Sequence, residues 1–262
     1  MRLSISMLLF GLASGGLSGA AFQNGGFETP VLPGTPTFDF VVVPTGWVKF
    51  DPSCGGIANC TGSALFLQLY SAFGLPAAGG QGTQAFGFGG NFITTGSLVQ
   101  TFDTTPGATY HVSFQYVIQQ GAGFEDLVLD VLNGPVSGVA TNSAGCTGSA
   151  GCLASTGTVR FNNTAWVTRT LDFTATVPST SLRFSDFSGL EPSDHIFTNW
   201  GLDAVSVTQT GGPTAVPEPS GLSLIVCGLA AVTFLKLKAL YRFKRLSPAS
   251  EGSRTGTFQT GP

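Results

Sequence analysis

An alternation of apolar and polar side chains constrains the fold of this chain more than any other feature. From Tyr110 to Ile118 every second residue is apolar, and polar residues fill most positions between them. A period of two is typical of a β-strand with one buried face. The turn signal Pro106-Gly107 directly precedes the segment. The sequence therefore predicts a long strand here that buries one of its faces.

Five further segments show similar alternation: SLVQTF from Ser97, DLVLDVL from Asp126, WVTRTLDFTA from Trp166, SLRFSDF from Ser181 and GLDAVSV from Gly201. Turn residues separate them, and no segment between them has the spacing of a crossover helix, so the sheets should be antiparallel. We expect an all-β antiparallel β-sandwich, specifically a jelly roll. The glycine-rich FGFGGNF from Phe86 lacks the residues of a phosphate-binding loop and is predicted to be a flexible loop.

Both ends of the chain indicate export. Residues 1–21 have a positive start, an apolar stretch and a small-residue cleavage site, which is typical of a signal peptide. Residues 22–210 then form the ectodomain, and residues 211–220 a Pro/Gly linker. Residues 221–241 are predicted to be one transmembrane helix, extended by lysine side chains that reach the interface. The basic residues that follow the apolar run should hold the end of the helix, and the tail 242–262, on the cytoplasmic side; they are Lys236, Lys238, Arg242, Lys244 and Arg245.

Four cysteines form two pairs with the same spacing. Cys54 and Cys60 enclose GGIAN, and Cys146 and Cys152 enclose TGSAG. In an oxidising compartment this pattern predicts two local disulfides that fix loops. A zinc site with four thiolates is the alternative, although zinc ligands usually lie closer together in sequence.

Composition and motifs argue against several function classes. The ectodomain is acidic, so its field would repel nucleic acid. The sequence contains neither GxSxG nor HExxH. A glycosidase would need two carboxylates beside a cleft, and the best clustered acids are Glu125, Asp126 and Asp130. We expect these acids to lie on a solvated sheet face, so the chain is not predicted to be an enzyme.

The end of the chain resembles a known arrangement. Pro217, Glu218 and Pro219, the apolar run and the basic cluster are similar to the C-terminal signal of bacterial PEP-CTERM proteins. The resemblance implies sorting by an exosortase-like membrane protease in bacteria that make extracellular polysaccharide. The protein would be anchored in the inner membrane during sorting and then reach the cell surface or the extracellular space. Two features depart from that pattern: the basic cluster mixes lysines with arginines, and a polar tail continues after Leu246.

The ectodomain also resembles a family. NGGFETP from Asn24, GSLVQTFDTTPGATYHVSFQY from Gly96, AWVTRTLDFTA from Ala165 and GLDAVSVT from Gly201 are similar to choice-of-anchor domains related to galactose-binding-like jelly rolls. The resemblance implies a surface-displayed sandwich for cell-wall or extracellular polysaccharide. The cysteine loops and residues 76–95 depart from the family pattern, and there the ligand preference could differ.

A structural Ca²⁺ site is predicted where the first and last strands should run side by side. Glu28 ends the first of these strands and Asp203 lies in the last, which brings two hard oxygen ligands together. Carbohydrate-binding modules with similar NGxFE and LDxVSV segments have such a site, and that resemblance adds Asn24 to Glu28 and Asp203. Alternatively, the two acids accept hydrogen bonds from turn amides.

Sugar binding would need exposed aromatic rings. Trp47 and Trp166 are expected in the core, whereas Trp200 is expected to be exposed in a loop, with Tyr70, Phe92 and Asp194 beside it. The sequence thus predicts a non-catalytic surface protein that binds extracellular polysaccharide. The alternatives are a structural biofilm-matrix or protein-interaction module and, more remotely, a glycan-active enzyme. Glycans, a sorting protease and the membrane are the expected partners, and nucleic acid is not.

Overall fold

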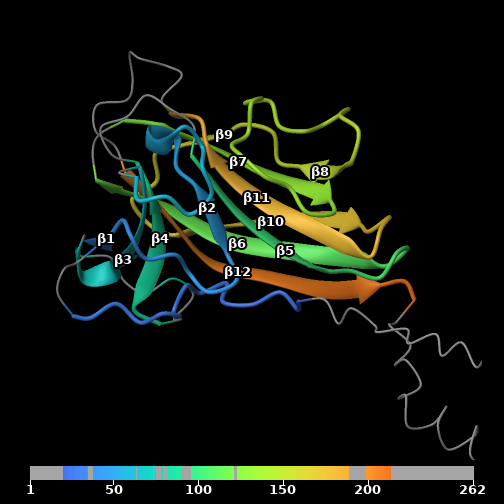
Figure 1. Cartoon of the computed structure of the whole chain (residues 1–262), viewed down its shortest axis with the longest axis horizontal. Helices are drawn as coiled ribbons and strands as arrows, with labels where there is room; N and C mark the ends of the chain where they lie inside the picture. The colour runs from blue at the N-terminus through green and yellow to red at the C-terminus, as the bar shows by residue number, and fades with distance from the viewer. Residues whose placement is uncertain are drawn as a thin grey trace, which may run out of the picture. The chain divides into compact units, whose positions relative to one another are not determined.

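The computed structural model describes residues 20–34, 38–62, 64–72, 74, 78, 82–89, 96–120, 123–188 and 199–213. These residues belong to one compact unit, a sandwich of two antiparallel sheets (Figure 1). The predicted signal peptide lies outside the described residues up to residue 19. Phe92, Asp194, the sorting motif Pro217–Pro219, the transmembrane segment 221–241 and the basic cluster from Lys236 to Arg245 also lie outside them.

Sheet A contains the longest strands. Its order is β1-β3-β4-β12-β6-β10, with β1 at Phe38–Asp39, β3 at Leu65–Leu69, β4 at Gln84–Phe88, β12 at Asn199–Gly211, β6 at Thr109–Gln120 and β10 at Val167–Thr174. The alternating segment from Tyr110 is the central part of β6, which pairs with both β12 and β10.

Sheet B has the order β2-β5-β11-β7-β8, and β9 also pairs with β7. The strands are β2 (Val48–Phe50), β5 (Ser97–Asp103), β11 (Ser179–Asp186), β7 (Glu125–Asn133), β8 (Cys152–Ser155) and β9 (Val159–Phe161). Successive strands from β4 to β7, and from β10 to β12, alternate between the two sheets, as in a jelly roll. Two short 3₁₀ helices, η1 (Pro52–Cys54) and η2 (Tyr70–Ala72), lie at strand ends.

All six segments with the period-two pattern are strands, so the expected sandwich is confirmed. Two local predictions were wrong. Phe86 and Phe88 lie in β4 and are fully buried instead of belonging to a flexible loop, because their rings alternate with Gly87 and enter the core. Residues 24–28 form a turn instead of a first strand, yet this turn still lies beside the last strand, since Gly25 O accepts from Val205 N at 2.9 Å.

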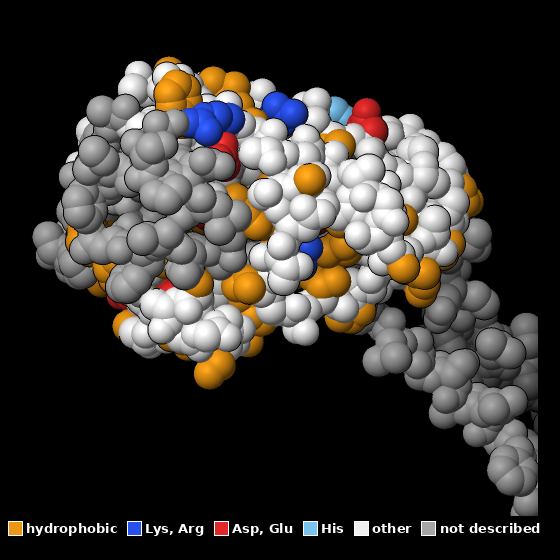
Figure 2. Space-filling model, turned by 90° about the horizontal axis from the view of Figure 1, so that it is seen from above, with side chains coloured by type: hydrophobic (Ala, Val, Ile, Leu, Met, Phe, Trp, Pro, Cys, Tyr) orange, Lys and Arg blue, Asp and Glu red, His pale blue; other side chains and the backbone are white. Residues whose placement is uncertain are grey.

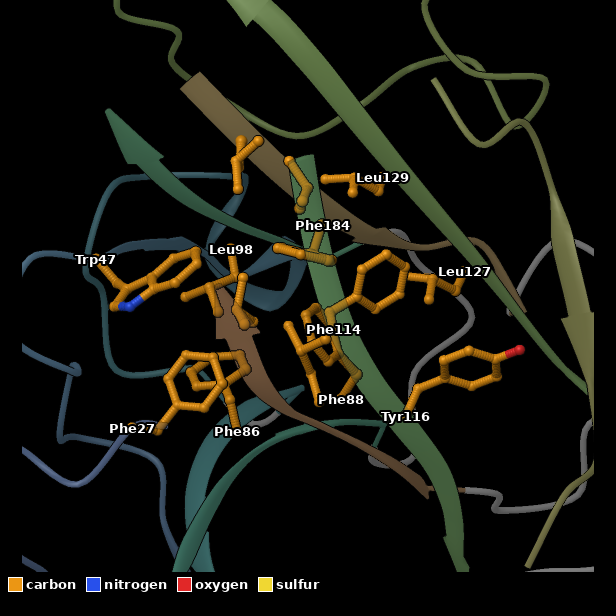
Figure 3. Packing of buried hydrophobic residues seen from close by; sticks show 14 of the residues in the cluster. Phe27, Trp47, Phe86, Phe88, Leu98, Phe114, Tyr116, Leu127, Leu129 and Phe184 are labelled. Carbon is orange, nitrogen blue, oxygen red and sulfur yellow. The ribbon is translucent and has the colours of Figure 1, made fainter. Parts of the chain in front are cut away.

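Aromatic rings from both sheets fill the core (Figure 3). Phe114 of β6 packs edge-on against Phe184 of β11 at 5.1 Å, which joins the two sheets. Trp47 is buried as expected and contacts Phe27 and Phe184. Burial of such large side chains is the main stabilising contribution in a sandwich with few charged residues.

The two ends of the described chain lie at the same end of the sandwich, beside the turn from β5 to β6. Asp103 N donates to Ala20 O at 2.9 Å, and a Cβ on Gly107 would lie 3.9 Å from the Pro213 ring. At the opposite end β2, β4, β6 and β11 end, and β3, β5, β7 and β12 begin. Within the part of the chain that is described, no helix has the length and apolar character needed to cross a membrane.

Candidate functional site

The outer face of sheet B, which is turned away from sheet A, is covered by a long loop. Leu127, Leu129 and Val131 point into the core, so Val128 and Asp130 between them face outward. Residues 134–151, here called the strap, connect β7 to β8 across this face. Ala140 of the strap is buried against Val128. The strap therefore replaces solvent over this part of the sheet.

Hydrogen bonds hold the strap on both sides of β11. Ala140 N donates to Ser97 Oγ of β5 at 3.1 Å, and Cys146 N donates to Asp130 Oδ1 of β7 at 2.8 Å. Because β11 lies between β5 and β7, the strap crosses it.

A disulfide fixes the returning part of the strap. Cys146 is bonded to Cys152, and Cys54 is bonded to Cys60, as the spacing predicted. The four-thiolate zinc alternative is therefore wrong. Gly145 has a φ of +83°, and a Cβ there would collide with the Ser155 hydroxyl. Only glycine permits this close approach of the strap to β8.

An ion pair forms the floor beneath the strap. Arg183 Nη2 of β11 lies 2.8 Å from Asp130 Oδ2, and the Asp130 side chain is only 1% exposed. The other oxygen of Asp130 accepts from Cys146 N and from the Ser155 hydroxyl, each at 2.8 Å. Both carboxylate oxygens are thus bonded, and the negative charge is balanced by the guanidinium.

The expectation of a solvated acidic sheet face was wrong. Glu125 and Asp126 are also buried, with 1% and 6% exposure. Glu125 alternates with the core residue Leu127 and so does not lie on the outer face. Burial, followed by the nearby Asp186 carboxylate, raises the pKa of Glu125 to about 9.

A pocket of about 340 Å³ lies between the strap and the ion pair. Asp130, Leu132 and Arg183 form its floor. Its walls come from both parts of the strap and are lined mainly by hydroxyl, amide and backbone groups; they include Val136, Ser137, Thr141, Asn142, Gly145 and Ser149. Ser137, Thr141, Asn142 and Ser149 are exposed. The arrangement presents several hydrogen-bonding groups around a site whose charges cancel.

A second site lies on the outer face of sheet A around Asp203. This side chain is fully buried, and burial, reinforced by the charge of Glu28, raises its pKa to about 9. The Tyr70 hydroxyl donates to Asp203 Oδ2, and Ala204 N donates to Oδ1 at 2.6 Å. In the described part of the chain Asp203 makes no ion pair.

Glu28 approaches this site from the N-terminal turn. Its Oε1 accepts from Thr83 N and Gln84 N, each at 2.8 Å. These are the turn amides of the alternative interpretation, although the charge of Glu28 still acts on Asp203. The Asn24 side chain hydrogen-bonds to backbone atoms: its Nδ2 donates to Thr29 O and Thr45 O, and its Oδ1 accepts from Thr29 N. The structure thus brings Glu28, Asp203 and Tyr70 together and leaves the Asn24 side chain occupied.

Of the residues expected to bind sugar, Tyr70 lines an open pocket and Trp200 does not. A pocket of about 560 Å³ is lined by Leu32, Leu69, Tyr70, Ser71 and Thr83, among others. Tyr70 also packs edge-on against the partly buried Trp166 at 5.9 Å. Trp200 was expected in an exposed loop, but it lies in β12 with no exposed surface and stacks on Phe88 at 4.1 Å. Trp200 occupies an inward-facing position of β12, so the expectation of an exposed ring was wrong.

The sequence did not reveal the strap pocket. Arg183 lies in an ordinary alternating strand, and Ser137, Thr141 and Asn142 lie in an irregular stretch without a motif. The available signal was the cysteine pair Cys146 and Cys152, which marks a loop beside the pocket. Among the residues that the structure describes, no three His, Cys, Asp or Glu side chains converge as a metal site.

The sequence matches no protein-family model and no curated protein. Several solved structures are similar at low sequence identity. The module TmCBM61, solved with β-1,4-galactotriose, is 14% identical, with a TM-score of 0.43 over 73% of this chain and 99% of its own. A CBM4 module is 16% identical, with a TM-score of 0.43 over 72% and 99%. The CBM22-1 xylan-binding domain of Paenibacillus barcinonensis Xyn10C is 10% identical, with a TM-score of 0.39 over 57% and 83%.

Proposed function

We propose that residues 20–213 form a non-catalytic module that binds polysaccharide, and that the pocket between the strap and sheet B is its binding site. The observation that carries the proposal is the lining of this pocket. Sugar hydroxyls both donate and accept hydrogen bonds, and the strap offers hydroxyl, amide and backbone partners of both kinds. The Asp130–Arg183 pair leaves the floor without net charge, which suits an uncharged ligand.

The hydrogen bonds of the floor support binding without catalysis. A general acid or nucleophile needs a carboxyl group that can reach the substrate. Both oxygens of Asp130 are bonded within the protein. In addition, few charged side chains interrupt the face drawn in Figure 2, where uncharged groups predominate.

We also propose that Ca²⁺ binds at Asp203 and Glu28 and stabilises the end of sheet A. A buried carboxylate without an ion pair is unfavourable, and Ca²⁺ prefers the oxygen ligands that the two acids supply. Backbone carbonyls would have to complete the coordination. Asn24 is not part of this proposal, because its side chain is occupied within its own turn. When bound, the ion would balance the negative charge that burial disfavours.

Export, membrane anchoring and processing by an exosortase-like protease belong to the same proposal. The two disulfides support it, since such bonds persist in oxidising compartments. Intact-mass measurement of the cell-surface species tests the processing step. A mass short of the residues after Pro219 is expected, and the full mass with reduced cysteines would contradict it.

Retention on immobilised glycans tests the binding proposal. The purified full-length protein would be passed over β-1,4-galactan, xylan and a wider panel, with the Thr141→Ala variant alongside. Retention on at least one glycan is expected, and Thr141→Ala should weaken it. Thr170→Ala, an exposed threonine on β10 of the other sheet, is the matched control and should leave retention unchanged. Absence of retention across the panel would refute glycan binding.

A further inference from the structure

The strap does more than line the proposed glycan pocket, because it interrupts the sheet face. Its bonds to Ser97 and Asp130 lie on opposite sides of β11. The strap also approaches the Cys54–Cys60 loop, because a Cβ on Gly56 of that loop would lie 3.6 Å from Val139 of the strap. A long ligand therefore has no uninterrupted path over β11 between these contacts.

Both parts of the strap contribute walls to the pocket. Val136 and Ser137 come from the outgoing part, and Thr141, Asn142 and Cys146 from the returning part. The volume of about 340 Å³ is near the lower end of the roughly 300–1,000 Å³ usual for small-ligand sites. The pocket thus has room for a short saccharide, with walls on two sides.

Both parts of the strap are fixed to the sheet. At its start, Gly134 N donates to Ser179 O and the Ser181 hydroxyl donates to Gly134 O, each at 2.7 Å. On its return, the Cys146–Cys152 disulfide and the bond from Cys146 N to Asp130 hold it. A wall fixed at both ends is preorganised and does not yield to a ligand at low cost.

We infer that the strap restricts this pocket to the end of a saccharide chain and excludes the interior of a polymer. The inference rests on the proposed glycan binding and specifies its ligand. A chain end can enter between the two parts of the strap, whereas an internal segment would have to pass through one of them. Sugar rings beyond the first few then project into solvent and add no contacts.

Calorimetric titration of the full-length protein with β-1,4-galacto-oligosaccharides and β-1,4-xylo-oligosaccharides of one to six rings tests the inference. We expect the Kd of the best series to fall from one ring to two or three, and then to stay within about twofold up to six. A hexamer that binds at least tenfold tighter than the trimer would overturn the inference while leaving glycan binding intact. No binding to either series or to the wider panel would refute glycan binding itself.

Competition with polymers provides a second readout. Equal masses of an intact polysaccharide and of the same polysaccharide shortened by partial hydrolysis would compete for the protein. Shortened chains should compete better, in proportion to their number of ends. Equal competition per mass would overturn the inference.

Substitution of two exposed side chains tests whether the saccharide binds between the two parts of the strap. Ser137→Ala changes the outgoing part of the strap and Thr141→Ala the returning part, and both residues are exposed enough to be replaced without disturbing the core. Each variant should weaken binding of trimer and hexamer by the same factor, about 2- to 10-fold. The control Thr170→Ala should change neither. A hexamer insensitive to both strap variants would show that it binds elsewhere and overturn the assignment.

Discussion

Asp130 and Asp203 are both buried carboxylates on the outer faces of their sheets, but their surroundings differ. Asp130 faces the Arg183 guanidinium at 2.8 Å and accepts two further hydrogen bonds. Asp203 has the Tyr70 hydroxyl and one backbone amide, and the charge of another acid, Glu28, acts on it. The protein therefore compensates one buried acid with an ion pair, and no ion pair in the described part of the chain compensates the other.

The comparison separates two kinds of site. Around Asp130 the charges cancel, and the pocket above them can bind an uncharged ligand. In the described part of the chain no ion pair balances Asp203 when it is ionised, and the site should respond to pH and to divalent cations. Four experiments sharpen this contrast.

Removing the arginine should have the largest effect. Arg183→Met leaves Asp130 buried without its counter-charge, which should lower the free energy of unfolding by about 3–5 kcal/mol. Urea denaturation measures the loss. The double variant Arg183→Met/Asp130→Asn should recover much of the stability. A loss below about 1 kcal/mol in the single variant would show that Asp130 does not depend on this partner.

Calcium should affect only the other acid. At a free Ca²⁺ concentration of 100 times its Kd, binding should stabilise the full-length protein by about 2.7 kcal/mol, and EDTA should lower the Tm accordingly. Asp203→Asn and Glu28→Gln should abolish the difference between Ca²⁺ and EDTA, whereas Asp172→Asn, an exposed acid on β10, should keep it. An identical Tm in Ca²⁺ and EDTA would contradict the cation site.

The pH dependence in EDTA should follow from the raised pKa values. Asp203 and Glu125 have folded-state pKa values of about 9, above about 4 in the unfolded chain. The folded state thus holds protons that the unfolded state has released, and stability must fall as pH rises between these values. We expect the unfolding free energy to decrease continuously from pH 5 to pH 8.

Single variants show which carboxyl causes the pH dependence of the unfolding free energy. Asp203→Asn and Glu125→Gln should each flatten part of it, and saturating Ca²⁺ should flatten the Asp203 part in the unmodified protein. Stability that rises over the same pH range would mean that both carboxyls are ionised in the folded protein.

The smallest effect is expected in the strap. Thr141→Ala removes one hydroxyl from the pocket wall, which should weaken glycan binding by about 1 kcal/mol, or several-fold, without changing the Tm. Calorimetry with the best ligand from the glycan panel measures it, with Thr170→Ala as the control. Unchanged affinity in Thr141→Ala would place the ligand away from this wall.

Local patterns predicted the sandwich well because alternation reports directly which residues are buried. The strand from Tyr110, its partner strands β10 and β12, and β11 of the other sheet follow from that period. The disulfides follow from the cysteine spacing. Trp200 shows the limit of such patterns: its burial depends on where β12 begins, and strand boundaries are weakly specified by sequence.

The candidate site was less predictable, because it depends on contacts between distant segments. Glu28 was expected beside Asp203, and its charge does act on that carboxyl, although Glu28 belongs to a turn and not to a strand. Asp130 and Arg183 lie 53 residues apart, and nothing in either segment indicates that they pair. The path of the strap over β11 is set by bonds to Ser97 and Asp130, which no local pattern encodes.

The position of a bound saccharide tests the central claim most directly. Backbone amide NMR of the isotope-labelled full-length protein, titrated with the tightest oligosaccharide of the calorimetric series, would map the site. The account predicts that the largest shifts occur at Ser137, Thr141, Asn142 and Gly145, with little change at Tyr70 and Thr83. Shifts concentrated at Tyr70 and Thr83, with the strap amides unmoved, would contradict it.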